Sequence, residues 1–156
     1  MLQQSKNSDD FTFDTAEEMQ QFGSKLAKLL SAGDVVFLIG DLGSGKTTFA
    51  KGIISELCGS ENQVTSPTFN LVHVWDAEKF EVWHADLYRL DNPAQVIGLG
   101  LEDAFDHALC LIEWPDRMGE MAPDLRLDIC FSHHGQGRKV VLRAMGKEWE
   151  QRINVL

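Results

Sequence analysis

The sequence predicts an α/β protein in which a mostly parallel central sheet, with one antiparallel hairpin inserted, lies between two layers of helices. Two observations carry this prediction. Residues 35–39 form a short, wholly apolar run, which is typical of a strand buried on both faces of a parallel sheet. A glycine-rich loop follows, and the apolar residues after Lys46 are then spaced as on one face of a helix that ends near Gly59.

The glycine-rich loop at residues 40–47, Gly-Asp-Leu-Gly-Ser-Gly-Lys-Thr, fits the phosphate-binding pattern G-x-x-x-x-G-K-[ST]. Such a backbone turns its amide N–H groups toward a triphosphate, and the helix that follows aims its positive end at the same charge. We expect Lys46 to reach the β- and γ-phosphates and Thr47 to place its hydroxyl on Mg²⁺. The residues expected to bind the phosphates are Gly43, Ser44, Gly45, Lys46, Thr47 and Thr48. The loop and its setting predict the fold of a P-loop NTPase.

Two carboxylates are expected at the carboxyl ends of strands, where ligands bind in sheets of this kind. Glu113 ends the apolar run at residues 108–112 in the Walker B arrangement, which can hold Mg²⁺ or a metal-bound water. Asp86 ends the strand expected at residues 80–85 and is a candidate for positioning water. The alternative for Asp86 is a strand-end cap or an ion pair with Arg89.

Thr68 lies between the P-loop helix and the next strand, where P-loop enzymes commonly sense the γ-phosphate. The alternative is a simple turn whose side chains bond to their own backbone. With this residue included, the expected catalytic set is Lys46, Thr68, Asp86 and Glu113.

The remaining pattern predicts a disordered tail at residues 1–10 and a single domain at residues 11–156. Phe11 and Phe13 alternate with polar residues as in an edge strand. Thr15 opens a capping box, and the helix that follows is expected to stop at Gly33. Further strands are expected at residues 71–75, 80–85, 108–112, 125–131 and 139–144, and further helices at residues 92–98, 99–107 and 145–156.

The composition limits the classes of function. The 24 Asp and Glu residues outnumber the 14 Lys and Arg residues, and the formal net charge of −10 does not favour binding of nucleic acid by the chain alone. Three cysteines, two of them in apolar or alternating runs, indicate buried thiols rather than a disulfide framework or a zinc site. Without a membrane-spanning run or a secretory signal, the chain is expected in the cytoplasm.

Four segments together resemble the bacterial TsaE (YjeE) family in order and spacing. They are residues 40–48, residues 66–69 (SPTF), residues 84–90 (HADLYRL) and residues 112–115 (IEWP). The resemblance runs from about residue 11 to residue 143, which is most of the chain. Two departures are small, because Ser44 in place of a frequent Ala, and Phe69 in place of a frequent Tyr, remove no group with an expected catalytic role.

The resemblance implies an ATPase that works with the proteins TsaB and TsaD in making threonylcarbamoyladenosine, a modification of tRNAs that read codons beginning with A. It implies ATP and Mg²⁺ as ligands, contact with tRNA only through the complex, and a low ATPase activity that the complex raises. Residues 43–48 would bind the phosphates, Thr47 and Glu113 would hold Mg²⁺, and Asp86 would contribute to nucleotide binding or hydrolysis.

The resemblance also extends the site beyond the phosphate loop. It places Thr15 and the turn at Gly137 and Arg138 close to the nucleoside, and it makes Trp114 a candidate member of the same site.

The residues themselves favour adenine over guanine, because the sequence lacks the guanine-reading N-K-x-D motif. Arg89 and Arg117 are the candidates for an arginine finger, but neither stands out, so we expect slow hydrolysis alone and faster hydrolysis with partners. Two alternatives stay open. A small-molecule kinase would need an acceptor pocket and normally an arginine-bearing lid, and a nucleotide-gated binding module would change shape on binding ATP.

Overall fold

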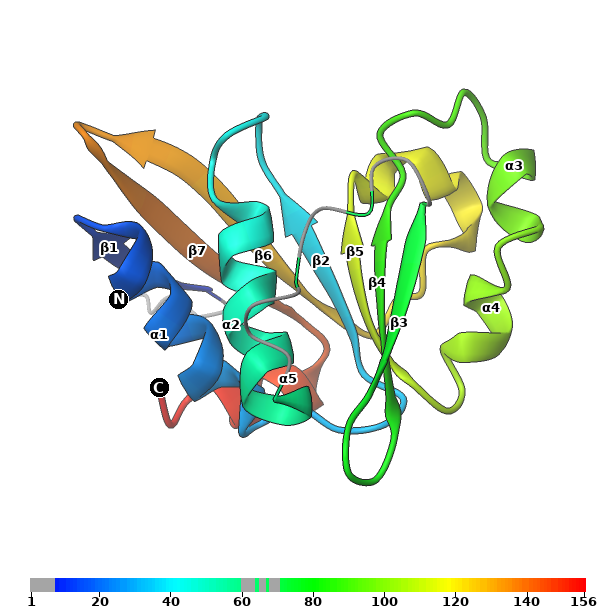
Figure 1. The fold of residues 1–156 in the computed structure, drawn as a ribbon, viewed down its shortest axis with the longest axis horizontal. Coiled ribbons are helices and arrows are strands. Elements are labelled where there is room, and N and C mark those ends of the chain that lie inside the picture. Colours follow the sequence, from blue (N-terminus) through cyan, green and yellow to red (C-terminus); the bar gives the residue numbers. More distant parts are fainter. Residues whose placement is uncertain (1–7, 60–63, 65–66, 68–70) are drawn as a thin grey trace, which may run out of the picture.

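A seven-stranded sheet forms the centre of the computed structural model, which describes residues 8–59, 64, 67 and 71–156 (Figure 1). The strands are β1 (Ser8–Phe13), β2 (Val35–Ile39), β3 (Val72–Asp76), β4 (Glu81–Asp86), β5 (Leu109–Glu113), β6 (Arg126–His134) and β7 (Gly137–Met145). The helices are α1 (Ala16–Ala27), α2 (Lys46–Cys58), α3 (Ala94–Ile97), α4 (Leu101–Ala104) and α5 (Lys147–Ile153), and η2 (Pro115–Met121) is a 3₁₀ segment with a kink.

The strand order is β1-β7-β6-β2-β5-β4-β3. The four central strands run parallel, because β2 pairs in parallel with both β5 and β6, and β5 with β4. At the edges the pairing is antiparallel, with β3 against β4 on one side and β7 against β6 and β1 on the other. The predicted α/β fold is therefore confirmed, and the sheet is mixed.

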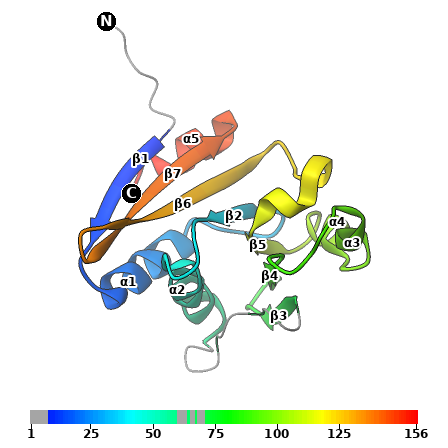
Figure 2. The same cartoon turned by 90° about the horizontal axis from the view of Figure 1, so that it is seen from above.

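Helices cover both faces of the sheet, which confirms the predicted three layers. Figure 2 shows α1 and α2 together on one side, and α3 and α4 on the other side of β4 and β5. Successive side chains of β2 point to opposite faces of the sheet, so alternate residues pack against the two helical layers. Val36 and Leu38 join the core under α1 and α2, whereas Val35 and Phe37 join the core under α3, α4 and η2.

Two glycines bring α1 and α2 into backbone contact. A Cβ atom on Gly52 would lie 2.1 Å from the carbonyl oxygen of Gln20, and one on Gly23 would lie 2.6 Å from that of Phe49. The Ser24 hydroxyl also donates to the Gly52 carbonyl at 3.1 Å. This contact anchors α2, the helix that follows the phosphate loop, against the first helix of the chain.

The N-terminal boundary differs from the prediction. Residues 8–10 were expected in a disordered tail, but β1 begins at Ser8 and pairs with β7 from Ser8 opposite Arg143 to Phe13 opposite Arg138. The reason is that backbone hydrogen bonds to a long neighbouring strand extend the pairing without apolar side chains. Thr68, the predicted γ-phosphate sensor, lies outside the described residues.

The C-terminal helix is tied to the start of β2. Arg152 donates to both carboxylate oxygens of Asp34, at 2.6 and 2.8 Å, and to the carbonyl of Leu29 at 3.1 Å. The pKa of Arg152 is raised, chiefly by its hydrogen bond to Asp34. The bonded guanidinium therefore joins α5 to the loop between α1 and β2.

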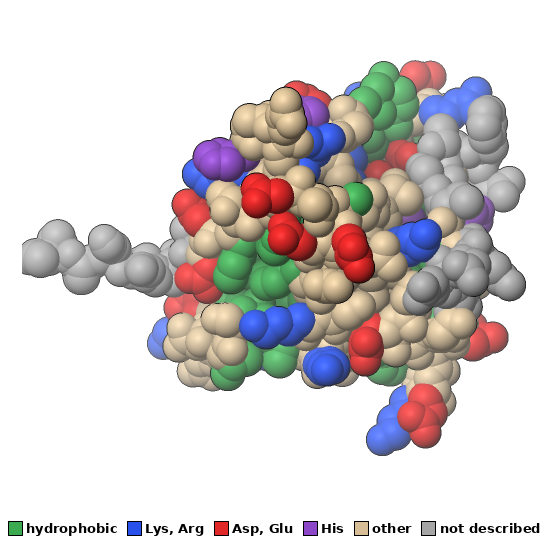
Figure 3. All heavy atoms as spheres, turned by 60° about the vertical axis from the view of Figure 1, so that its left-hand side comes forward, with side chains coloured by type: hydrophobic (Ala, Val, Ile, Leu, Met, Phe, Trp, Pro, Cys, Tyr) green, Lys and Arg blue, Asp and Glu red, His purple; other side chains and the backbone are tan. Residues whose placement is uncertain are grey.

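The cysteines are free thiols, and their burial differs. Cys110 is buried as expected, whereas Cys130 and Cys58 are half-buried. On the face drawn in Figure 3, acidic and basic side chains are interspersed. Within the described part of the chain, the helices are too short or too polar to cross a bilayer.

Candidate nucleotide site

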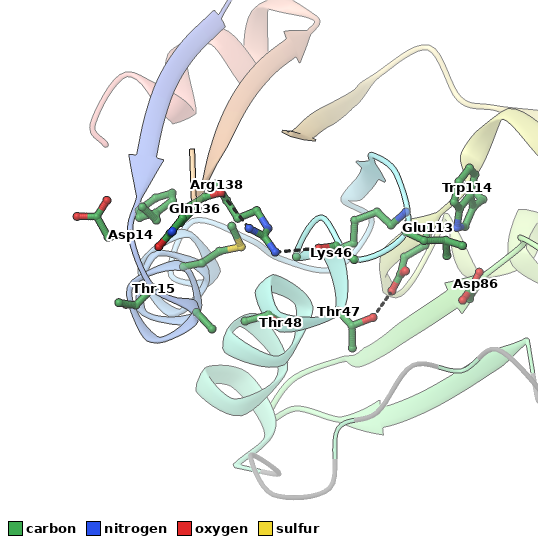
Figure 4. Close-up of a pocket in the computed structure, with 17 residues that line it drawn as sticks. Asp14, Thr15, Lys46, Thr47, Thr48, Asp86, Glu113, Trp114, Gln136 and Arg138 are labelled. Carbon is green, nitrogen blue, oxygen red and sulfur yellow. Dashed lines mark hydrogen bonds between the residues drawn. The ribbon is translucent and has the colours of Figure 1, made fainter. Parts of the chain in front are cut away.

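A cavity of about 460 Å³ lies at the carboxyl ends of the central strands, beside the N-terminus of α2. Its volume is within the range of small-molecule sites in proteins. Figure 4 shows Lys46, Glu113, Asp86 and Trp114 toward one end, and Thr15, Gln136 and Arg138 toward the other. The lining residues are Phe13, Asp14, Thr15, Ala16, Met19, Leu42, Gly43, Gly45, Lys46, Thr47, Thr48, Asp86, Glu113, Trp114, Gln136, Gly137 and Arg138.

The phosphate loop joins β2 to α2 in a tight curl. The Ser44 amide donates to the Asp41 carbonyl at 3.1 Å, and Gly45 caps the helix with φ 109°, a conformation that glycine adopts without strain. A Cβ atom on Gly45 would also meet the Met19 sulfur at 2.6 Å. Because the first amide N–H groups of a helix have no partner within it, α2 offers donors to an anion in the cavity.

Lys46 is buried, with 5 % of its surface exposed, and its ammonium group faces the loop itself. It donates to the Gly40 carbonyl, approaches the Asp41 carbonyl at 3.5 Å, and lies 4.0 Å from the centre of the Trp114 ring. Trp114 has a left-handed backbone with φ 59°, unusual for a bulky residue. Burial lowers the pKa of Lys46, while the carboxylate of Glu113 acts in the opposite direction.

Glu113 and Thr47 form a pair at the end of the cavity that holds Lys46. The Thr47 hydroxyl donates to Glu113 Oε2 at 3.2 Å, and the same oxygen lies 2.7 Å from Nε2 of His84. Hard oxygen ligands of this kind suit Mg²⁺, which takes one or two protein ligands and fills its other positions with waters and phosphate oxygens. Among the described residues there is no cluster of three or more His, Cys, Asp or Glu side chains that could form an all-protein cage. The Thr47 hydroxyl and the Glu113 carboxylate are hard oxygen donors that fit a nucleotide-bound Mg²⁺.

Asp86 lies beside Glu113, because the parallel register of β4 and β5 pairs these two residues. The Asp86 carboxylate accepts a hydrogen bond from the Tyr88 amide at 3.0 Å, so it also caps the end of its strand. The two interpretations of Asp86, as a strand-end cap and as a residue of the site, are therefore compatible, because Asp86 caps β4 and also lines the cavity.

The other end of the cavity is formed by the entry to α1 and the turn between β6 and β7. Thr15 caps α1, with its hydroxyl accepting from the Glu18 amide at 3.1 Å, which confirms the predicted cap. The return bond of the capping box is shifted by one residue, because the Glu18 carboxylate accepts from the Asp14 amide at 2.8 Å. Arg138 donates to the Gly43 carbonyl at 3.1 Å and so links the β6–β7 turn to the phosphate loop. Segments far apart in the sequence thus meet at one wall.

Within the described part of the chain, the predicted site residues line one cavity, apart from Ser44, which is buried within the phosphate loop. Their binding roles stay predictions. Sequence reasoning missed Met19, Gln136 and His84. Met19 follows the helical spacing of a core residue, so the sequence carried no signal for its place at the cavity. His84 had one signal, its position two residues before Asp86 on the same strand.

A buried strand, a phosphate loop on a helix N-terminus and an acid on the neighbouring parallel strand define the class of P-loop NTPases. The sequence model of the family described as threonylcarbamoyl adenosine biosynthesis protein TsaE matches residues 13–140. The chain belongs to the TsaE family.

Individual proteins that are similar to this chain support the same family. The tRNA threonylcarbamoyladenosine biosynthesis protein TsaE of Rickettsia conorii is 43% identical over 105 residues, covering 67% of this chain and 60% of that protein. The Bacillus subtilis protein of the same name is 34% identical over 137 residues, covering 86% and 84%. The crystal structure of Bacillus subtilis YdiB is 28% identical, covers 95% of this chain and 93% of that chain, and superposes with a TM-score of 0.78.

Proposed function

We propose that this chain is a Mg²⁺-dependent ATPase that acts with TsaB and TsaD in the threonylcarbamoyladenosine modification of tRNAs that read codons beginning with A. The observation that carries the proposal is the meeting of Lys46, Thr47 and Glu113 in one cavity at the N-terminus of α2. Membership of the TsaE family supports the pathway. We place this activity in a single unit that includes β1 from Ser8 onward, and in the cytoplasm.

In the proposed site, the amide groups at residues 43–48 and the Lys46 ammonium group bind the phosphates of ATP. Thr47 and Glu113 hold Mg²⁺, which neutralises charge on the phosphate oxygens when it is bound. Asp86 orients water beside Glu113. Thr15 and Arg138, at the far end of the cavity, contact the nucleoside.

We expect the chain to hydrolyse ATP slowly in the absence of its partners, because the arginines near the site, Arg117 and Arg138, already bond to backbone oxygens. Arg117 donates to the Tyr88 carbonyl at 3.3 Å, and Arg138 donates to the loop carbonyl of Gly43. Both guanidinium groups are thus engaged with backbone oxygens. A partner that supplies or frees a cation would lower the barrier, since an arginine finger is worth about 10³–10⁵ in rate.

The direct experiment measures phosphate release by the chain with and without TsaB and TsaD, and scores tRNA modification over many turnovers. We expect slow release alone, faster release in the complex, and modification that continues only while ATP is hydrolysed. Rapid release by the chain alone, unchanged by the partners, would contradict the proposal.

A small-molecule kinase is the first rival. The middle of the described chain forms the β3–β4 hairpin at the edge of the sheet, where a kinase would place an arginine-bearing lid. Transfer of the γ-phosphate to a metabolite without release of free phosphate would favour the kinase.

A nucleotide-gated binding module is the second rival. Glu113→Gln separates it from an ATPase, because the amide keeps the size of the side chain but removes its negative charge. If the variant binds ATP without hydrolysing it and tRNA modification still continues over many turnovers, hydrolysis is incidental and the module is the better description.

A further inference from the structure

We propose that His84 is a positioning residue that fixes the orientation of the Glu113 carboxylate toward Mg²⁺. The inference rests on the proposed function, since it deepens the role of Glu113 there. It depends on the placement of His84, its burial, and the hydrogen bonds that meet at one oxygen of Glu113.

The sheet places His84 directly behind the site. It lies on β4 two residues before Asp86, so the two side chains share the face of the sheet that α1 and α2 cover. In the register of β4 and β5, His84 pairs with Leu111 and Asp86 pairs with Glu113. His84 therefore lies two residues further from the carboxyl end of its strand than Asp86 does, and the same distance from the level of Glu113.

Burial makes this contact strong. His84 has no exposed surface, and Glu113 exposes 3 % of its own. The distance between Nε2 of His84 and Oε2 of Glu113 is 2.7 Å, which is typical of a hydrogen bond to an ionised acceptor. A buried carboxylate that lost this donor would be left partly unsatisfied.

The chemistry of the acceptor sets the tautomer of His84. An ionised carboxylate accepts and cannot donate, so Nε2 must carry the proton that lies between the two groups. Nδ1 is buried and has no hydrogen-bond partner among the described residues.

Two donors hold the same oxygen of Glu113. His84 bonds to Oε2 from the sheet, and the Thr47 hydroxyl bonds to Oε2 from α2. With Oε2 held from both sides, the carboxylate has one orientation, and Oε1 is the oxygen left for metal or water. A group that holds a metal ligand from behind in this way typically changes metal affinity 10–100-fold when it is removed.

The test compares two amides that differ in reach. In His84→Gln the amide nitrogen takes the place of Nε2 and can still donate to Glu113. In His84→Asn the amide nitrogen takes the place of Nδ1 and cannot reach it. The readout is calorimetric titration of a non-hydrolysable ATP analogue across a series of Mg²⁺ concentrations and in EDTA, with thermal unfolding as the check on folding.

We expect the asparagine variant to need about tenfold more Mg²⁺ for the same gain in affinity. Its affinity in EDTA should match that of the parent chain, and the glutamine variant should stay close to the parent in both conditions. Equal Mg²⁺ dependence in parent and asparagine variant, or equal loss in both variants, would overturn the proposal.

A second measurement needs no substitution and no ligand. Long-range ¹H–¹⁵N spectra of the nucleotide-free parent chain report which imidazole nitrogen carries the proton. We expect a proton on Nε2 of His84, whereas a proton on Nδ1 alone would overturn the proposal. If the parent chain bound no nucleotide, the proposed function would fail, and these spectra would still decide whether His84 holds Glu113.

Discussion

Lys46 holds a charge in a part of the molecule from which water is largely excluded. Its ammonium group is balanced by loop carbonyls, by the Trp114 ring and by the carboxylates nearby. Burial lowers the pKa of Lys46, so the ammonium form is held at a cost that a bound phosphate would relieve. The residue is therefore poised for an anion.

We predict that Lys46→Ala weakens ATP binding by about 2 kcal/mol, roughly thirtyfold, because a charge-assisted hydrogen bond is lost. Thr47→Ala should leave affinity in EDTA unchanged and reduce the gain that Mg²⁺ provides. Calorimetric titration of both variants is the measurement. If both variants bound ATP with the affinity of the parent chain in the presence of Mg²⁺, residues 40–47 could not be assigned as the phosphate loop.

Cys110 provides a prediction for pH. Burial raises the pKa of its thiol from the ordinary value of 9.0 to about 12, so the folded chain keeps this proton after the unfolded chain has lost it. The stabilisation is complete below pH 9 and is lost as the pH rises toward 12. The free energy of unfolding of the parent, relative to Cys110→Ala, should fall by about 1.4 kcal/mol per pH unit above 9. Urea unfolding at pH 8 and 10.5 tests this, and a constant difference would refute it.

The sequence alone predicts the site residues that belong to a recognisable local motif. Lys46 and Thr47 follow from the glycine loop, and Glu113 follows from an apolar run that ends in an acid. His84 and Gln136 could not be found in this way. The place of Gln136 depends on a turn from the far end of the chain, which leaves no local pattern. The contact of His84 with Glu113 depends on strand register, and its spacing from Asp86 signals only that the two residues share a face of the strand.

At the scale of elements, the packing of α1 on α2 determines where the phosphate loop lies. Gly23 and Gly52 allow the two backbones to approach within a distance that a methyl group would prevent. Because α2 begins at Lys46, a shift of this helix would move the N-terminus that faces the cavity.

We predict that Gly52→Ala lowers the free energy of unfolding by about 1–3 kcal/mol, since its Cβ would lie 2.1 Å from the Gln20 carbonyl. The gain in helix propensity of about 1 kcal/mol does not compensate. Gly98→Ala is the matched control, because a Cβ atom there meets nothing within 4 Å. Equal stability of the two variants, measured by chemical unfolding, would argue against the close contact.

The type and order of the strands and α-helices were predictable, but their ends and the 3₁₀ segment η2 were not. The central strands are apolar runs, and α1 has its predicted cap. In contrast, β6 and β7 extend to His134 and Gly137, and β1 extends back to Ser8. Polar residues join these strands because the neighbouring backbone supplies the hydrogen bonds, and a single sequence does not reveal that neighbour.

At the scale of the whole molecule, the distribution of charge favours binding of a nucleotide over binding of a nucleic acid. The net charge of −10 repels a long phosphate backbone, while the cavity concentrates donors for one short polyphosphate. This charge distribution agrees with the proposed function, in which the chain binds ATP and leaves tRNA to its partners.

We predict that the chain alone does not retard tRNA in a native gel at about 0.15 M salt, a condition in which surface charges are screened beyond about 8 Å. Retardation should appear when TsaB and TsaD are added. A complex of tRNA with the chain alone that weakens steeply as salt is added would contradict the prediction.

The ring of Trp114 rests 4.0 Å from the ammonium group of Lys46. The colour and intensity of indole emission depend on charges close to the ring. A nucleotide that draws the cation away therefore alters the light that the ring emits. Trp114 is one of four tryptophans in the chain. If ATP binds as proposed, the part of the emission that comes from Trp114 should time its arrival in a stopped-flow instrument without an attached label.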